Sequence, residues 1–150
     1  MDLNLNLVDT IAREAFRDKI DKSGKPYLEH LRYVANVASD VKKGAYDKDV
    51  FCIGMLHDLL EDCPEWNEKA LRQLIPEHIV DAVVVLTKGK DEPYEDYITR
   101  VLQNEYAVKV KKADLEHNMD ITRLPILTDK DIERLKKYHK AYLRITNNLK

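Results

Sequence analysis

The chain has few of the residues that interrupt or cross-link a protein. Its 150 residues include only 4 glycines, 5 prolines and 2 cysteines. Two cysteines cannot form the framework of several disulfides that stabilises small secreted domains, so we expect a reducing compartment. Because glycine and proline are scarce while Leu, Ala, Glu and Lys are abundant, the composition favours helices over a strand-and-turn architecture.

Long hydrophobic runs and an excess of one charge are also missing. No run of about 18 uncharged apolar residues occurs, and residues 1–4 lack the basic region and apolar run of a signal peptide. We therefore expect a cytoplasmic protein without a membrane partner. The 25 Lys and Arg residues nearly balance the 27 Asp and Glu residues, for a net charge of −2. This balance argues against a nucleic-acid partner bound through a bulk basic field.

The length suits one ordinary domain, and no repeat, low-complexity stretch or linker divides residues 1–150. The sequence therefore predicts a single domain. Apolar periodicity predicts helices at residues 3–20, 27–43, from Asp47 or Asp49 to about 62, and then at 67–74, 76–86, 94–104, 106–122 and 128–147. Residues 82–86 also have the β propensity of a strand, but no partner strand is visible. The predicted fold is a compact all-α bundle.

The third predicted helix is the most hydrophobic, yet it contains His57, Asp58, Glu61 and Asp62. Charged groups in apolar surroundings cost several kcal/mol each unless they are paired, hydrogen-bonded or metal-bound. On one continuous helix, Glu61 lies one turn above His57 and Asp62 one turn above Asp58. Gly54 would let another helix approach closely. The alternative is a packed His-Asp pair or cap, followed by the solvated end of the helix.

Two further polar side chains, His30 and Asp114, lie on predicted inward faces of other helices. A packed histidine is the simpler interpretation of His30 alone. Together with His57 and Asp58, however, these residues would provide two imidazole nitrogens and two carboxylates. Such a set suits Mn²⁺ or Fe²⁺, with Zn²⁺, Co²⁺ or Ni²⁺ as alternatives, and leaves coordination positions open for water.

Three segments carry a resemblance to a known family. They are residues 23–30 (SGKPYLEH), residues 57–62 (HDLLED) and residues 111–119 (KKADLEHNM). Their order and spacing resemble the HD superfamily of metal-dependent phosphohydrolases, and more narrowly the hydrolase domain of RelA/SpoT-type alarmone enzymes. The match spans about residues 1–125, and the predicted helix at about 128–147 follows it.

The resemblance implies an all-helical HD-type domain with one bound Mn²⁺. In that family the domain removes pyrophosphate from the ribose 3′ position of guanosine tetra- or pentaphosphate. The resemblance implies metal ligands at His30, His57, Asp58 and Asp114 and a water-activating acidic pair at Glu61 and Asp62. The chain has no room for the synthetase and regulatory domains of long family members. We therefore expect a stand-alone hydrolase whose partner is a small nucleotide, in an oligomeric state that the sequence leaves open.

Candidate substrate contacts follow from the same three motifs. The resemblance places Asn118 at a residue that contacts the nucleotide near the ribose. Tyr27, Lys25 and Lys111 are further candidates, although an aromatic residue at helical spacing is more often part of a core and a lysine is more often solvated. His117 is a candidate for contact with a metal-ligating side chain.

Lys112 takes a position that is usually apolar in the family, and two acidic residues also depart from the family pattern. Asp21 stands where the family commonly has an arginine that packs on the nucleobase, and Asp120 stands where it commonly has a basic residue. Both carboxylates would repel an anionic substrate unless Lys22, Lys25 or Arg123 compensates. They keep open a phosphatase acting on another nucleotide or a phosphorylated dinucleotide cofactor. The third hypothesis, a non-catalytic metal- or ligand-binding regulatory module, is disfavoured by the intact acidic pair.

Overall fold

The fold is described from a computed structural model, over residues 1–42 and 45–149. The elements are α1 (Leu5–Ala15), α2 (Tyr27–Ser39), β1 (Asp40–Lys42), β2 (Ala45–Tyr46), α3 (Lys48–Leu56), α4 (Leu59–Asp62), α5 (Glu68–Arg72), α6 (Glu77–Val85), α7 (Tyr94–Val101), α8 (Glu105–Asn118), the 3₁₀ helix η1 (Ile121–Arg123) and α9 (Asp129–Asn148). The predicted all-α fold is confirmed. Within the described residues it is supplemented by one short antiparallel ribbon, β1 with β2.

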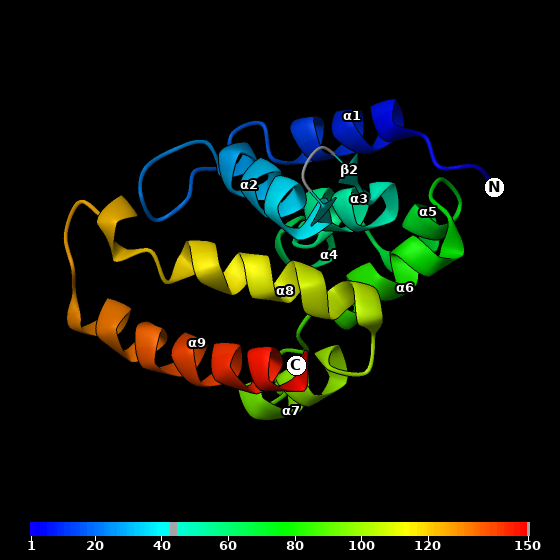
Figure 1. Ribbon diagram of the computed structural model, residues 1–150. Helices are drawn as coiled ribbons and strands as arrows, with labels where there is room; N and C mark the ends of the chain where they lie inside the picture. Colours follow the sequence, from blue (N-terminus) through cyan, green and yellow to red (C-terminus); the bar gives the residue numbers. More distant parts are fainter. Residues whose placement is uncertain (43–44, 150) are drawn as a thin grey trace.

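Helix α8 lies at the centre of the arrangement (Figure 1). It packs against α2 and α3 on one side and against α9 on the other, while α1 covers α3. Residues such as Leu31, Ile53, Leu56 and Leu115 are fully buried between these helices. Residues 82–86, which also had strand propensity, lie in or next to α6. None of the helices in the described ranges combines the length and apolar character needed to cross a membrane.

Helix α2 ends earlier than its apolar pattern predicts. The expected helix ran to residue 43, but α2 ends at Ser39 and the chain turns into β1. The Ser39 carbonyl accepts a hydrogen bond from the Asp47 N–H at 2.8 Å instead of continuing the helix. Asp47 then caps α3 by accepting from the N–H groups of Asp49 and Val50. Residues 43 and 44 lie outside the described part of the chain.

The prediction of one helix up to Asp62 is wrong, because the chain breaks at His57 and Asp58. The His57 Nδ1–H donates to the Gly54 carbonyl at 2.7 Å, and Asp58 has φ −101° and ψ 2° at the start of α4. Neighbouring residues of a continuous helix point about 100° apart. The break brings His57 Nε2 to 3.1 Å from Asp58 Oδ2, so both side chains face one point.

Gly54 brings α3 into contact with α2, as its position in the sequence indicated. A Cβ atom at Gly54 would lie 2.6 Å from the Ala35 Cα and 3.0 Å from the Ala35 backbone nitrogen. Both neighbours are main-chain atoms of α2 and cannot rotate away. The absence of a side chain at residue 54 therefore sets the separation of the two helices.

We predict that Gly54→Ala lowers the free energy of unfolding by about 2 kcal/mol, the usual cost of overpacking a core. Urea unfolding followed by circular dichroism measures this change. Because the collision is with main-chain atoms, adding Ala35→Gly should restore none of the lost stability. A Gly54→Ala protein as stable as the parent would contradict the close contact.

Candidate active site

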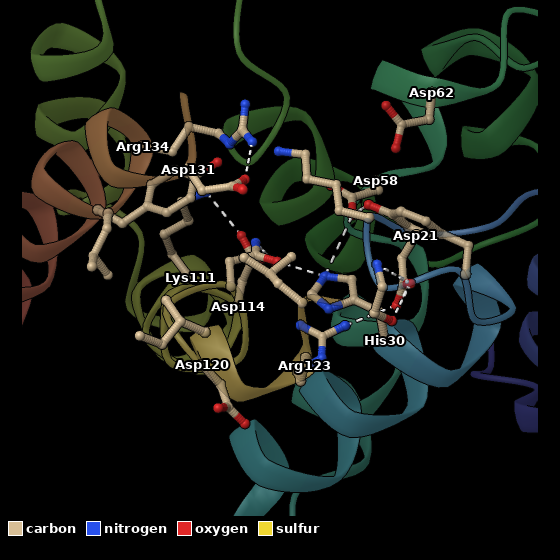
Figure 2. Close-up of a pocket in the computed structure, with 18 of the residues that line it drawn as sticks. Asp21, His30, Asp58, Asp62, Lys111, Asp114, Asp120, Arg123, Asp131 and Arg134 are labelled. Carbon is tan, nitrogen blue, oxygen red and sulfur yellow. Dashed lines mark hydrogen bonds and ion pairs between the residues drawn. The ribbon is translucent and has the colours of Figure 1, made fainter. Parts of the chain in front are cut away.

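Four side chains from three separate segments converge in the interior. His30 comes from α2, His57 and Asp58 from the junction of α3 and α4, and Asp114 from α8. One ligand atom from each lies within 4.8 Å of the others. Figure 2 shows His30 turned toward Asp58 and Asp114. His30, His57 and Asp114 are buried and Asp58 is nearly so. The arrangement is able to hold a metal ion, and the role of each residue as a ligand stays a prediction.

Asp114 is the most densely hydrogen-bonded member of this cluster. Its Oδ1 lies 2.9 Å from His30 Nε2 and 3.4 Å from His57 Nε2, and accepts from the Asn118 amide at 3.0 Å. Its Oδ2 accepts from the buried Lys111 ammonium at 2.9 Å. Burial opposes the charged carboxylate, but Lys111 and the two imidazoles hold the pKa of Asp114 well below its usual range. Asp114 is therefore a carboxylate.

Hydrogen bonds on the far side of each imidazole orient the two histidines. A carbonyl only accepts, so the bond from His57 Nδ1 to Gly54 fixes one proton on Nδ1. The carboxylates of Asp58 and Asp114 beside Nε2 raise the pKa of His57 well above its usual range, so Nε2 would have to release a proton in order to bind a metal ion. His30 Nδ1 lies 2.7 Å from His117 Nδ1. Burial, with the charges of Arg123 and His30, lowers the pKa of His117 to about 4. Neutral His117 is suited to accept the His30 proton, which agrees with the predicted contact with a ligating side chain.

The acidic pair lies on α4, beside the cluster. Glu61 Oε1 accepts from the Lys88 backbone N–H at 2.9 Å. Burial, together with the charges of Asp58 and Glu61, raises the pKa of Asp62 to about 6. Burial also raises the pKa of Glu61, although the Lys88 N–H opposes it. Carboxylates with raised pKa values are suited to proton transfer near neutral pH.

These groups open into a cavity of about 280 Å³. Seven carboxylates line it: Asp21, Asp58, Glu61, Asp62, Asp114, Asp120 and Asp131. The lining lysines and arginines are Lys22, Lys111, Arg123 and Arg134. Three of them already pair with lining carboxylates: Lys111 with Asp114, Arg123 with Asp21 and Arg134 with Asp131. The lining of the cavity therefore contains more carboxylates than lysine and arginine side chains.

Helix α9 forms one wall of the cavity, a role that sequence reasoning missed. It contributes Asp131, Arg134, Leu135 and Tyr138. The matched motifs end before this helix, so they gave no indication that it lines the cavity. A signal was present, since Asp131, Arg134 and Tyr138 have the i, i+3, i+7 spacing that places residues on one helix face.

Of the four residues predicted to contact the substrate, three line the cavity and one does not. The Tyr27 hydroxyl donates to Asp58 Oδ2 at 2.6 Å, and Asn118 and Lys111 donate to Asp114. These three side chains therefore contact the candidate ligands and also line the cavity. Lys25 is exposed and is not among the residues that line the cavity in the described ranges. Their contacts with a nucleotide stay predictions.

Asp21, one of the two acidic departures from the family pattern, is compensated by Arg123. Asp21 Oδ1 accepts from the backbone N–H groups of Ser23 and Lys25, at 2.9 and 3.1 Å. Its Oδ2 accepts from Arg123 at 2.8 Å, and Arg123 also donates to the His117 carbonyl. The pair joins the turn before α2 to the end of α8. Asp120, the other departure, is exposed and caps η1 through the Thr122 N–H.

Sequence comparison finds relatives among alarmone enzymes. The bifunctional (p)ppGpp synthase/hydrolase SpoT of Escherichia coli (strain K12) is 26% identical over 120 residues, which are 73% of this chain and 16% of that protein. A GTP pyrophosphokinase of Myxococcus xanthus is 31% identical over 114 residues, which are 67% of this chain and 15% of that protein. The chain is a relative of the RelA/SpoT-type enzymes. The resemblance to this family is thereby confirmed, and the chain spans about a sixth of the length of these relatives.

Structural comparison extends the similarity to the whole fold. A solved structure described as a metazoan ortholog of SpoT that hydrolyzes ppGpp has a TM-score of 0.72 with this chain. The superposition covers 97% of this chain and 87% of that chain, at 18% sequence identity. At this identity the likeness establishes a shared fold. No protein-family model matches the chain.

We predict that Lys111→Met destabilises the metal-free protein by about 3–5 kcal/mol, because it leaves the Asp114 carboxylate buried without its cation. The neighbouring Lys112→Met is a matched control. Lys112 pairs with Glu116 at 3.1 Å and its side chain is 37% exposed, so its loss should cost about 1 kcal/mol or less. Denaturant unfolding in the presence of a chelator measures both. If both variants lost the same free energy of unfolding, the buried pair of Lys111 with Asp114 would contribute no more than an exposed pair.

Proposed function

We propose that this chain is a metal-dependent hydrolase that releases pyrophosphate from the 3′ position of a guanosine alarmone. The observation that carries the proposal is the meeting of two imidazoles and two carboxylates at the wall of a cavity that also contains the acidic pair. The substrate class is supported by the name of a relative from Escherichia coli O157:H7, guanosine-3′,5′-bis(diphosphate) 3′-pyrophosphohydrolase, which is 26% identical to the chain over 120 residues.

The donor set fits a divalent ion, and we propose Mn²⁺. Imidazole nitrogen combined with carboxylate oxygen suits Mn²⁺ and Fe²⁺ among the common ions. Charge also fits a bound cation, because with both imidazoles neutral the carboxylates of Asp58 and Asp114 face one ammonium, that of Lys111, which leaves one negative charge in the cluster. When bound, such an ion lowers the pKa of water and neutralises charge on phosphoryl oxygens.

The side chains of this protein would then supply orientation and proton transfer. Tyr27 holds the Asp58 carboxylate, and Asn118 holds that of Asp114. Glu61 and Asp62 are the groups that would accept a proton from the attacking water, because they line the cavity and have raised pKa values. Lys22 also lines the cavity and forms no ion pair with any residue in the described ranges, so it is the cation we expect to meet a phosphate.

We predict that ligand variants and acid–base variants separate in their effects. Asp58→Ala and Asp114→Ala should abolish both Mn²⁺ binding, measured by calorimetry, and pyrophosphate release. Glu61→Gln and Asp62→Asn should bind Mn²⁺ normally but lose turnover by roughly 10²–10⁴-fold, the usual contribution of a general base. Glu65→Gln is the control, because Glu65 is exposed and does not line the cavity.

Two outcomes would contradict these assignments. Full activity in Asp58→Ala and Asp114→Ala would refute the metal centre. Loss of Mn²⁺ binding in Glu61→Gln and Asp62→Asn would mean that the acidic pair belongs to the ligand set instead of the proton-transfer machinery.

A second candidate function is a phosphatase acting on another nucleotide or a phosphorylated dinucleotide cofactor. The observation in its favour is the charge of the cavity, where seven carboxylates and paired cations offer little positive charge to a substrate with four or five phosphates. A substrate with fewer phosphate groups would be repelled less by the carboxylates of this cavity.

A substrate panel with Mn²⁺ separates the functions. We expect pyrophosphate from guanosine 3′,5′-bis(diphosphate), and complete loss of release after a chelator is added. Inorganic phosphate as the product from other nucleotides would select the phosphatase. Nucleotide binding without any product would select the non-catalytic regulatory module and reject both hydrolases.

A further inference from the structure

The connection between α6 and α7 is held by side chains that bind its carbonyl oxygens. The last carbonyls of a helix have no partners within the helix. At the end of α6, Arg100 donates to the Val85 and Thr87 carbonyls at 3.0 and 3.2 Å. The Tyr97 hydroxyl donates to the Leu86 carbonyl at 2.8 Å. Two side chains of α7 thus fix three successive carbonyls of the connection.

Arg100 also binds the far end of the same connection. Its Nε and one terminal nitrogen donate to the two carboxylate oxygens of Glu92, at 2.9 and 2.7 Å. Glu92 Oε1 also accepts from the Gly89 N–H at 3.1 Å. One guanidinium therefore links the beginning of the connection, at Val85 and Thr87, to its end at Glu92. These bonds close the segment between them into a loop.

The backbone N–H of Lys88, inside this loop, points out of it toward the acidic pair. It donates to Glu61 Oε1 at 2.9 Å, across a separation of 27 residues along the chain. The other oxygen, Oε2, accepts no hydrogen bond from any residue in the described ranges. The orientation of the Glu61 carboxylate thus depends on a single amide, whose position depends on the loop.

We propose that Arg100 is a positioning residue for Glu61. By clamping the connection between α6 and α7, it holds the Lys88 N–H against Oε1 and leaves Oε2 available for a proton. The inference deepens the proposed function and rests on it, since it is useful only if Glu61 takes part in hydrolysis. It also makes residues 88–93 a fixed support for Glu61 and not a lid.

The clamp needs an arginine for a geometric reason. A guanidinium is planar and carries five N–H donors, which allows it to bind two carbonyls and both oxygens of a carboxylate at once. The lysine ammonium keeps the charge, but its three N–H donors lie on one nitrogen and cannot span the same acceptors. Arg100→Lys therefore tests geometry at constant charge. Arg72→Lys is a matched control, because Arg72 also binds two carboxylates and one carbonyl, at Glu68, Asp81 and Glu77, away from the loop.

The first measurement is hydrogen exchange of the Lys88 amide by NMR, which needs no substrate. We expect exchange at Lys88 to be at least about tenfold faster in Arg100→Lys, because the amide loses its fixed acceptor. It should also be faster in Glu61→Ala, which removes the acceptor itself, and unchanged in Arg72→Lys. An unchanged Lys88 amide in Arg100→Lys would overturn the clamp.

The second measurement is steady-state kinetics on the Mn²⁺-loaded enzyme. We expect Arg100→Lys to lower kcat by about tenfold or more, since small displacements of a reacting group are costly. KM and the Kd for Mn²⁺ should each change by less than about threefold, and Arg72→Lys should match the parent. A purely structural role would instead reduce the folded fraction and leave the kcat of the folded protein unchanged.

The two measurements distinguish failure of this inference from failure of the proposed function. Faster Lys88 exchange with an unchanged kcat, while Glu61→Gln still loses turnover, would overturn the positioning role and leave hydrolysis intact. If the parent protein hydrolyses no nucleotide, or Glu61→Gln keeps full activity, the proposed function fails in its own right, and the positioning role fails with it even if the exchange data show the clamp.

Discussion

The buried carboxylate of Asp114 is the group on which the site depends. Removing a carboxylate from water costs several kcal/mol unless partners replace the lost hydration. Here Lys111 and Asn118 come from the same helix, while His30 and His57 arrive from α2 and from the end of α3. Because the imidazoles share one oxygen of Asp114, its charge fixes the relative positions of three helices that contain candidate ligands.

This convergence requires the backbone to leave regular geometry at one place. Helix α3 stops at Leu56, and the His57 side chain binds the Gly54 carbonyl. Without that break, His57 and Asp58 would point to different sides of one helix. The fold thus gives up regular helical geometry in its most apolar segment so that two successive side chains face Asp114. The close approach of Gly54 to Ala35 keeps this bent segment against α2.

Local patterns in the sequence predict most of the fold and the central residues of the candidate site. Apolar periodicity places the long helices, with α9 found within one or two residues of its predicted bounds. The break at His57 could not be predicted, because Met55, Leu56, Leu59 and Leu60 around it all favour a helix. The break is accompanied by a hydrogen bond from the His57 side chain to the Gly54 carbonyl, a contact that helix propensities do not describe. The sequence also could not show that Arg123 is the residue that pairs with Asp21, because 102 residues separate the two.

Helix α9 lies beyond the last matched motif and runs beside α8 (Figure 1). Its Asp131 and Arg134 nevertheless line one side of the cavity (Figure 2). The candidate ligands therefore all lie between His30 and Asp114, whereas the residues that line the cavity extend along the chain to Tyr138. A fragment cut after residue 127 would contain every candidate ligand but would lack Arg134 and Tyr138, which line the cavity. To decide where a domain with this site ends, the packing of α9 on α8 is therefore a better guide than the positions of the sequence motifs.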